Sequence, residues 1–116
     1  MSLEGRRILL VEDEYFIVQD LARAFAAAGA VVVGPSATAA DALRQIAATQ
    51  KLDGAVLDIN LQGEMVYAVA DALATRGVPF VFATGYDQES IPERFSGCAR
   101  CEKPVKPDQV AKALFG

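Results

Sequence analysis

Several polar side chains in this sequence follow short apolar runs and are of the types that transfer phosphoryl groups. Three of them are carboxylates, which repel one another when close together and then raise one another's pKa. A hard divalent cation such as Mg²⁺ relieves this repulsion, because it takes oxygen ligands. A carboxylate beside such an ion can attack phosphorus, while an ammonium and a hydroxyl contact the transferred oxygens. The residues concerned are Glu12, Asp13, Asp58, Thr84 and Lys103.

The composition excludes several other chemistries. The 116 residues include no histidine, which excludes Ser-His-Asp and Cys-His catalysis within the chain and a His-ligated zinc site. The net charge of −4 argues against nucleic acid or an anionic membrane surface as the main partner. The longest apolar stretch, about residues 24–33, is broken by Gly29 and is too short to span a bilayer. With no signal peptide recognisable either, we expect a cytoplasmic protein.

Apolar runs alternate with helical patterns along the whole chain. With 53% hydrophobic residues, the chain can bury a core, and its length fits a single domain over residues 1–116. Short apolar runs between glycines, prolines and acids predict buried strands. These runs lie at 8–11, 31–33 (ended by Gly34 and Pro35), 53–57, 79–83 and 98–101.

Helices are predicted between these strands from apolar residues three and four positions apart. A capping box at Thr38 and Asp41 predicts the start of the second helix. Ile91 and Pro92 make a long regular helix doubtful before the last strand. The predicted apolar positions are Ile17, Leu21, Ala24 and Ala28 (flanked by Val18 and Phe25), then Ala39, Leu43, Ile46 and Ala47, then Val66, Val69, Ala70 and Leu73, and, in a helix opened by Asp108, Val110, Ala113 and Leu114.

Five buried strands alternating with helices predict an α/β fold in which a parallel sheet is covered on both faces. In such sheets ligands bind beyond the carboxyl ends of the strands, where the strand order reverses. The polar residues named first all follow predicted strands and none comes from the opposite edge. We therefore expect them on one rim, with Asp58 as the nucleophile for a phosphoryl group.

The motifs at these strand ends resemble those of the receiver domain of response regulators in two-component signalling. The resemblance extends from Ile8 to Leu114 and depends on four motifs occurring in order. It implies a flavodoxin-like, doubly wound (βα)₅ fold with strand order 2-1-3-4-5, here with a short or irregular fourth helix. The motifs are Val11-Glu12-Asp13, Leu57-Asp58-Ile59-Asn60, Ala83-Thr84-Gly85 and Lys103-Pro104.

The resemblance also implies roles for individual residues. Asp58 would accept a phosphoryl group from a histidine kinase or a phosphotransfer protein, and the chain would catalyse its own phosphorylation and dephosphorylation. Thr84 would be the switch hydroxyl and Lys103 the phosphate contact. The Mg²⁺ ligands would be Glu12, Asp13, Asp58 and the backbone carbonyl of Asn60. The output, the downstream effector and the oligomeric state, including a homodimer, stay open.

The chain departs from the family pattern at two positions. Arg100 replaces the usual aromatic residue three positions before the lysine, and Gln62 replaces a usual proline, although Gly63 is retained. The run from Pro79 to Tyr86 resembles an atypical subgroup with a Phe-Ala-Thr-Gly signature, whose members lack the aromatic switch. Tyr86 or Arg100 could take over that role.

Two alternative functions follow from other features. A degenerate receiver would bind proteins without being phosphorylated. A thiol-disulfide oxidoreductase would use Cys98 and Cys101, but these lie late in the chain on a predicted strand, where residues three apart point to opposite faces. The acids, Asp58, Thr84 and Lys103 favour the phospho-accepting function.

Overall fold

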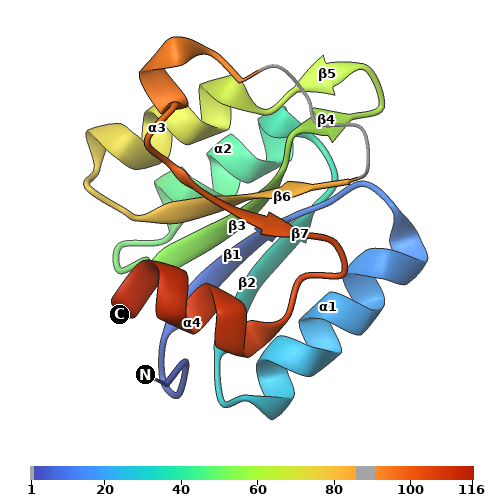
Figure 1. Cartoon of the computed structure of the whole chain (residues 1–116), viewed down its shortest axis with the longest axis vertical. Coiled ribbons are helices and arrows are strands. Elements are labelled where there is room, and N and C mark those ends of the chain that lie inside the picture. The colour runs from blue at the N-terminus through green and yellow to red at the C-terminus, as the bar shows by residue number, and fades with distance from the viewer. Residues whose placement is uncertain (1, 86–90) are drawn as a thin grey trace.

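Five parallel strands form the central sheet, in the order β2-β1-β3-β6-β7 (Figure 1). Counting only these five along the chain, the order is 2-1-3-4-5, as predicted. The computed structural model describes residues 2–85 and 91–116, so Tyr86 lies outside the described residues. The strands are β1 (Arg7–Val11), β2 (Val31–Ser36), β3 (Gly54–Asp58), β6 (Phe80–Thr84) and β7 (Ala99–Glu102).

Helices cover both faces of the sheet. The helix α2 (Ala39–Ala48), the helix α3 (Tyr67–Thr75) and the short 3₁₀ turn η1 (Glu93–Phe95) lie on one face. The helices α1 (Tyr15–Ala27) and α4 (Pro107–Phe115) lie on the other (Figure 1). Within the described residues 91–98, the predicted irregular fourth helix is a single 3₁₀ turn. None of the helices in the described ranges has the length and apolar character to cross a membrane.

The core consists of one apolar cluster on each face. Side chains alternate along the strands, so Ala55 and Leu57 of β3 join the cluster under α2 and α3, while Val56 joins the cluster under α1 and α4. All five residues of β3 and of β6 are buried. This two-sided burial explains why the strands are continuous apolar runs rather than alternating ones.

Three helices are rotated by about one position from the predicted apolar faces. In α1 the buried residues are Val18 and Phe25, whereas the predicted Ile17, Ala24 and Ala28 are exposed. Burying the Phe25 ring removes far more apolar area from water than burying an alanine, so the ring sets the orientation. In the same way, α2 buries Ala42 rather than the predicted Leu43 and Ala47. The helix α4 buries Ala111 rather than the predicted Ala113.

The predicted cap of α2 is confirmed, because the Thr38 Oγ1 accepts a hydrogen bond from the Asp41 N–H at 3.1 Å. The second strand runs on to Ser36, past the predicted end at Gly34 and Pro35.

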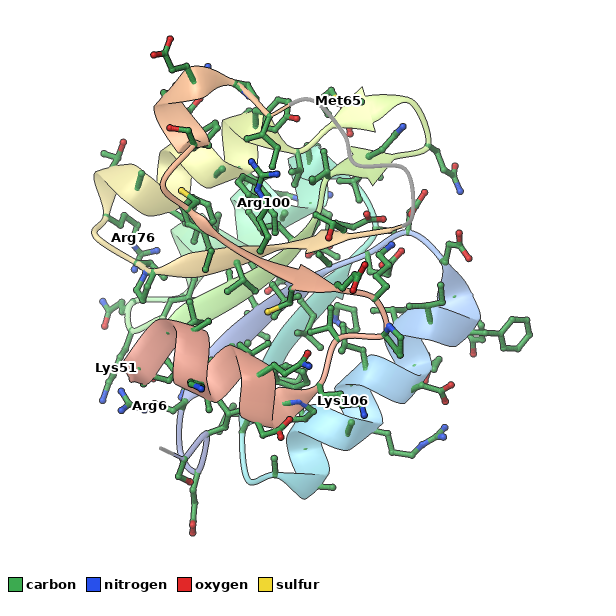
Figure 2. All side chains as sticks on the ribbon, viewed as in Figure 1. Arg6, Lys51, Met65, Arg76, Arg100 and Lys106 are labelled. Atoms are coloured by element: carbon green, nitrogen blue, oxygen red, sulfur yellow. The ribbon has the colours of Figure 1, made fainter. Side chains whose placement is uncertain are left out.

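A small hairpin between β3 and α3 was not predicted. Its strands are β4 (Asn60–Leu61) and β5 (Glu64–Met65), paired antiparallel. The two turn residues, Gln62 and Gly63, have φ of 54° and 89°, as a tight type I′ turn requires. Strands of two residues have no periodicity, so sequence patterns could not reveal them. Met65 is exposed on this hairpin (Figure 2).

Candidate functional site

The carboxyl ends of four strands meet at one rim of the sheet. Glu12 and Asp13 follow β1, whereas Asp58 is the last residue of β3 and Thr84 the last of β6. The parallel register pairs Val11 with Leu57 and Asp58 with Ala83, so these ends are level with one another. A hollow of about 470 Å³ opens there, lined by Asp13, Glu14, Asp58, Ile59, Asn60, Gln62, Gly63, Ala83, Thr84, Gly85 and Lys103.

Lys103, just after β7, connects the acids. Its Nζ lies 3.1 Å from Glu12 Oε2 and 3.2 Å from Asp58 Oδ1. The Glu12 residue is only 3% exposed and Asp58 is 9% exposed, so both carboxylates are largely removed from water. A lysine that reaches both acids compensates part of the charge that their burial leaves without solvation.

Three carboxylates fit the requirements of a hard cation. Glu12, Asp13 and Asp58 each offer an oxygen, and these oxygens all lie within 4.8 Å of one another. Asp13 and Asp58 line the hollow, whereas Glu12 does not, so one side of the group faces the hollow. An all-oxygen set that keeps an open side is the kind of site in which Mg²⁺ retains waters and meets phosphate oxygens.

The pairing of the hairpin decides whether the Asn60 carbonyl is used within it. Hydrogen-bonded and non-hydrogen-bonded pairs alternate along an antiparallel ladder. The Val66 N–H donates to the Ile59 carbonyl at 3.0 Å, so the next pair, Asn60 and Met65, is a non-hydrogen-bonded one. The ladder therefore leaves the Asn60 carbonyl unused, two residues after Asp58.

The crowding of the acids changes the pKa of Glu12. Burial and the neighbouring Asp58 raise the pKa of Glu12 to about 7, and the opposing effect of Lys103 does not cancel this. Partial burial alone would lower the pKa of Lys103, but Asp58 and Glu12 outweigh it and raise that pKa. Without a metal ion, the site therefore holds a proton on Glu12 at a pH where an ordinary glutamate has lost it.

The backbone of Thr84 is hydrogen-bonded to the backbone of Lys103. The Thr84 carbonyl accepts a hydrogen bond from the Lys103 N–H at 2.8 Å, which extends the pairing of β6 and β7 by one residue. Thr84 is 8% exposed and lines the hollow beside Asp58. The structure thus brings together the predicted site residues: Glu12, Asp13, Asp58, Asn60, Thr84 and Lys103.

The chain is similar to known response regulators. SdrG from Sphingomonas melonis Fr1 is 40% identical, with 98% of this chain and 96% of SdrG covered and a TM-score of 0.80. Another solved structure shows the BeF₃-activated conformation of SdrG, also at 40% identity (TM-score 0.76). A response regulator receiver protein from Sinorhizobium medicae WSM419 is 26% identical, with 97% of this chain and 94% of that one covered (TM-score 0.74). The chain belongs to the response-regulator receiver family.

A curated relative of this receiver is longer than the receiver itself. The transcriptional regulatory protein PdtaR of Mycobacterium tuberculosis is 27% identical over 110 residues, which cover 94% of this chain and 53% of PdtaR. The chain thus spans about half the length of that relative. No protein-family model matches the chain. Membership in the Phe-Ala-Thr-Gly subgroup stays a prediction.

Aromatic rings of this receiver gather on the face of the sheet where Arg100 stands in place of the family's usual aromatic residue. Arg100 pairs in register with Phe82 and is exposed on the face that carries α2 and α3 (Figure 2). Phe95 of η1 is one of the rings that pack on Phe82, with ring centroids 5.7 Å apart. Phe95 also stacks on Tyr67 at 5.8 Å. Sequence reasoning missed Phe95, because it lies in an irregular segment.

The two cysteines of the receiver do not form a redox pair. Cys98 packs against the cluster under α2 and α3, whereas Cys101 belongs to the cluster under α1 and α4. Both are free thiols, and burial raises the pKa of Cys101, which makes its thiolate less available. This geometry does not favour the thiol-disulfide oxidoreductase.

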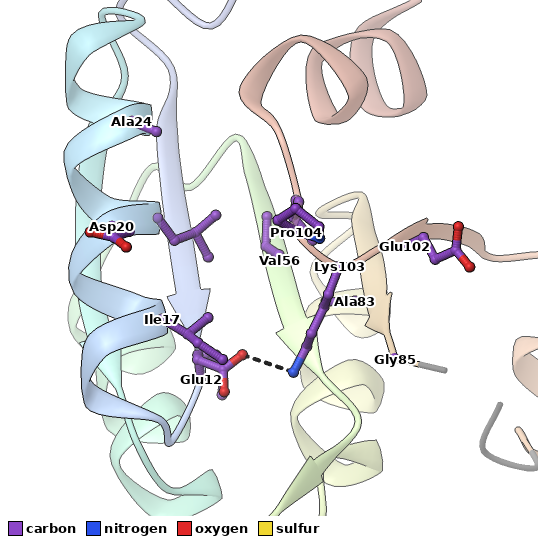
Figure 3. A pocket seen from close by; sticks show the side chains of 13 residues that line it. Glu12, Ile17, Asp20, Ala24, Val56, Ala83, Gly85, Glu102, Lys103 and Pro104 are labelled. Atoms are coloured by element: carbon purple, nitrogen blue, oxygen red, sulfur yellow. Dashed lines mark ion pairs between the residues drawn. The ribbon is translucent and has the colours of Figure 1, made fainter. Parts of the chain in front are cut away.

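A groove of about 750 Å³ lies beside the site, between α1 and the segment that follows β7 (Figure 3). Val56 and Ala83 line it from the sheet, and the ion pair of Glu12 and Lys103 lies at one end (Figure 3). At the start of α1, Tyr15 is 67% and Phe16 81% exposed.

Proposed function

We propose that this receiver accepts a phosphoryl group on Asp58 from the phosphohistidine of a histidine kinase or a phosphotransfer protein. The observation that carries the proposal is the contact of Asp58 with Lys103, inside a group of acids whose oxygens lie within 4.8 Å of one another. The chain has no histidine of its own, so the donor histidine belongs to the partner. A cytoplasmic location is part of the proposal.

In the transfer, one Asp58 carboxylate oxygen attacks the phosphorus, the new P–O bond forms and the P–N bond to the partner's imidazole breaks. The other ring nitrogen of the phosphohistidine takes a proton from solvent, so the imidazole leaves as a neutral group and atoms and charge balance. Mg²⁺, held by Glu12, Asp13, Asp58 and the Asn60 carbonyl, would neutralise charge on the phosphoryl oxygens. The Lys103 ammonium would move from the free carboxylate to the oxygens of the transferred group.

The acyl phosphate would then bias a two-state equilibrium of the surrounding surface. The phosphoryl group offers hydrogen-bond acceptors to the Thr84 hydroxyl at the end of β6. Because Phe82 lies two residues before Thr84 and packs on Phe95, a movement of β6 would change the packing of η1. Attack of water on phosphorus would release phosphate and restore Asp58. A downstream effector would recognise the altered surface.

The proposal is tested by incubating the receiver with acetyl phosphate and Mg²⁺ and measuring the intact mass. We expect one phosphoryl adduct, which is lost in Asp58→Asn. Asp20→Asn, on the exposed side of α1, is the matched control and should form the adduct normally. No adduct on the folded chain would instead favour the degenerate receiver, and an adduct that survives Asp58→Asn would move the acceptor to another residue.

A further inference from the structure

The hairpin that follows Asp58 is attached to a helix on the neighbouring part of the fold. Glu64 in β5 places its Oε1 3.1 Å from the backbone N–H of Ala39, which donates a hydrogen bond to it. Ala39 is the first residue of α2, 25 residues earlier in the chain. This contact joins two segments that sequence periodicity treats as independent.

The contact gives a hydrogen-bond acceptor to a backbone N–H group at the start of α2. The N–H groups in the first turn of a helix have no partner within the helix, and the helix dipole favours a negative charge there. The Thr38 hydroxyl accepts from the Asp41 N–H at 3.1 Å, and the Glu64 carboxylate accepts from the Ala39 N–H. Two side chains thus cap the same helix, but only Glu64 comes from the hairpin.

Two strands of two residues each are not stable alone, and Leu61 already attaches this hairpin to the fold, because it is buried in the cluster under α2 and α3. Within the hairpin, the Asn60 Oδ1 accepts from the Gly63 N–H at 2.7 Å, and the Ile59 carbonyl accepts from the Val66 N–H at 3.0 Å. These bonds set the conformation of Asn60 relative to its own turn. The Glu64 contact adds a polar attachment of the turn to α2, beside the apolar one made by Leu61.

We propose that Glu64 is a positioning residue for the proposed Mg²⁺ site: by holding the hairpin on α2, it keeps the Asn60 carbonyl in place near Asp58. The inference rests on the proposed function, since it assigns a purpose to a contact outside the group of acids. Glu64 itself is not one of the acids whose oxygens lie within 4.8 Å of one another. Loss of the contact would weaken metal binding by letting one of the oxygen ligands move.

The test is Mg²⁺ titration of the full chain by isothermal titration calorimetry, comparing wild type with three variants. In Glu64→Ala we expect the Kd for Mg²⁺ to rise by about tenfold, the lower end of the effect of residues that orient ligands. Glu64→Gln keeps an oxygen acceptor for the Ala39 N–H and should stay close to wild type. Thr38→Ala removes the other cap of the same helix without touching the hairpin, and should leave the Kd unchanged.

Amide hydrogen exchange in the absence of metal gives a second, independent readout. In Glu64→Ala the N–H groups of Gly63 and Val66 should exchange faster, and in Thr38→Ala they should not. Wild-type Mg²⁺ affinity in Glu64→Ala, or equal weakening in Thr38→Ala, would overturn the positioning role while leaving the proposed function intact. A wild-type chain that binds no Mg²⁺ at all would overturn both.

Discussion

Lys103 forms an ion pair with Glu12, with 3.1 Å between Nζ and Oε2, and the glutamate is almost completely buried. The same ammonium lies 3.2 Å from Asp58, so it compensates two acids at once. The stability of this site therefore depends on how much charge the acids carry.

The first prediction concerns the loss of this ammonium. Lys103→Met should lower the free energy of unfolding by about 1–3 kcal/mol at pH 8 without Mg²⁺, because two buried carboxylates lose their compensating charge. Urea unfolding followed by circular dichroism measures the change. Lys106→Met, an exposed lysine in the next segment, is the control and should have little effect (Figure 2). Equal losses in both variants would show that the ion pairs contribute nothing specific.

The second prediction follows from the pKa of Glu12, which is about 7 in the folded chain and 4.5 for an ordinary glutamate. Between these values the folded state binds more protons than the unfolded state, so stability falls as pH rises. Without Mg²⁺, the free energy of unfolding should therefore decline from pH 5 to pH 8. Glu12→Gln should flatten this dependence, as urea unfolding at several pH values would reveal. An unchanged slope in the variant would assign the effect to another group.

The positions of Asp58 and Lys103 could be predicted because they depend on one rule. In a parallel sheet every residue directly after a strand lies on the same rim, so the buried apolar runs alone locate the rim. No comparable rule gives the contact of Glu64 with Ala39. It joins residues 25 positions apart, from a hairpin too short for a period and a helix whose start is capped locally as well.

The helix faces show a second limit. Periodicity gives the spacing of apolar residues, but the orientation of α1 depends on whether the sheet receives Phe25 or the smaller Ala24 and Ala28. Packing against the sheet decides this orientation, because burying the larger ring removes more apolar area from water. For the same reason the contribution of Phe95, which comes from a 3₁₀ turn without a period, could not be derived from the sequence.

The third prediction concerns Ser36, at the end of β2. Its hydroxyl is buried and has no hydrogen-bond partner among the described residues. A buried hydroxyl without a partner loses its hydrogen bonds to water and gains none in the folded chain. Ser36→Ala should therefore leave the free energy of unfolding unchanged or raise it by up to about 1 kcal/mol. Thermal unfolding of Ser36→Ala beside the exposed Ser96→Ala tests this. A clear loss of stability only in Ser36→Ala would indicate that the hydroxyl binds a buried water.

The last prediction concerns the attachment of η1 to α3. The Arg94 guanidinium donates two hydrogen bonds to Asp71, Nε to Oδ1 and Nη2 to Oδ2, both 3.1 Å long. The neighbouring Phe95 is buried, and its carbonyl accepts from the Cys98 N–H at 3.0 Å. Opening of η1 would therefore expose the Cys98 thiol, whereas Cys101 lies in the other cluster. Arg94→Ala should raise the rate at which a disulfide reagent modifies Cys98 by about two- to fivefold, the effect of losing one exposed ion pair.

Arg23→Ala, which breaks the exposed pair with Asp20 on α1, is the matched control and should leave the rate at Cys98 unchanged. Adding beryllofluoride, which resembles a phosphoryl group, together with Mg²⁺ should accelerate the reaction in the wild-type chain as well, because a shift of Thr84 and Phe82 loosens the packing on Phe95. Mass spectrometry of the digested protein separates the two thiols. A rate at Cys98 that responds neither to Arg94→Ala nor to beryllofluoride would mean that η1 stays on α3 whatever happens at Asp58, and the signal would then have to leave the site through another element.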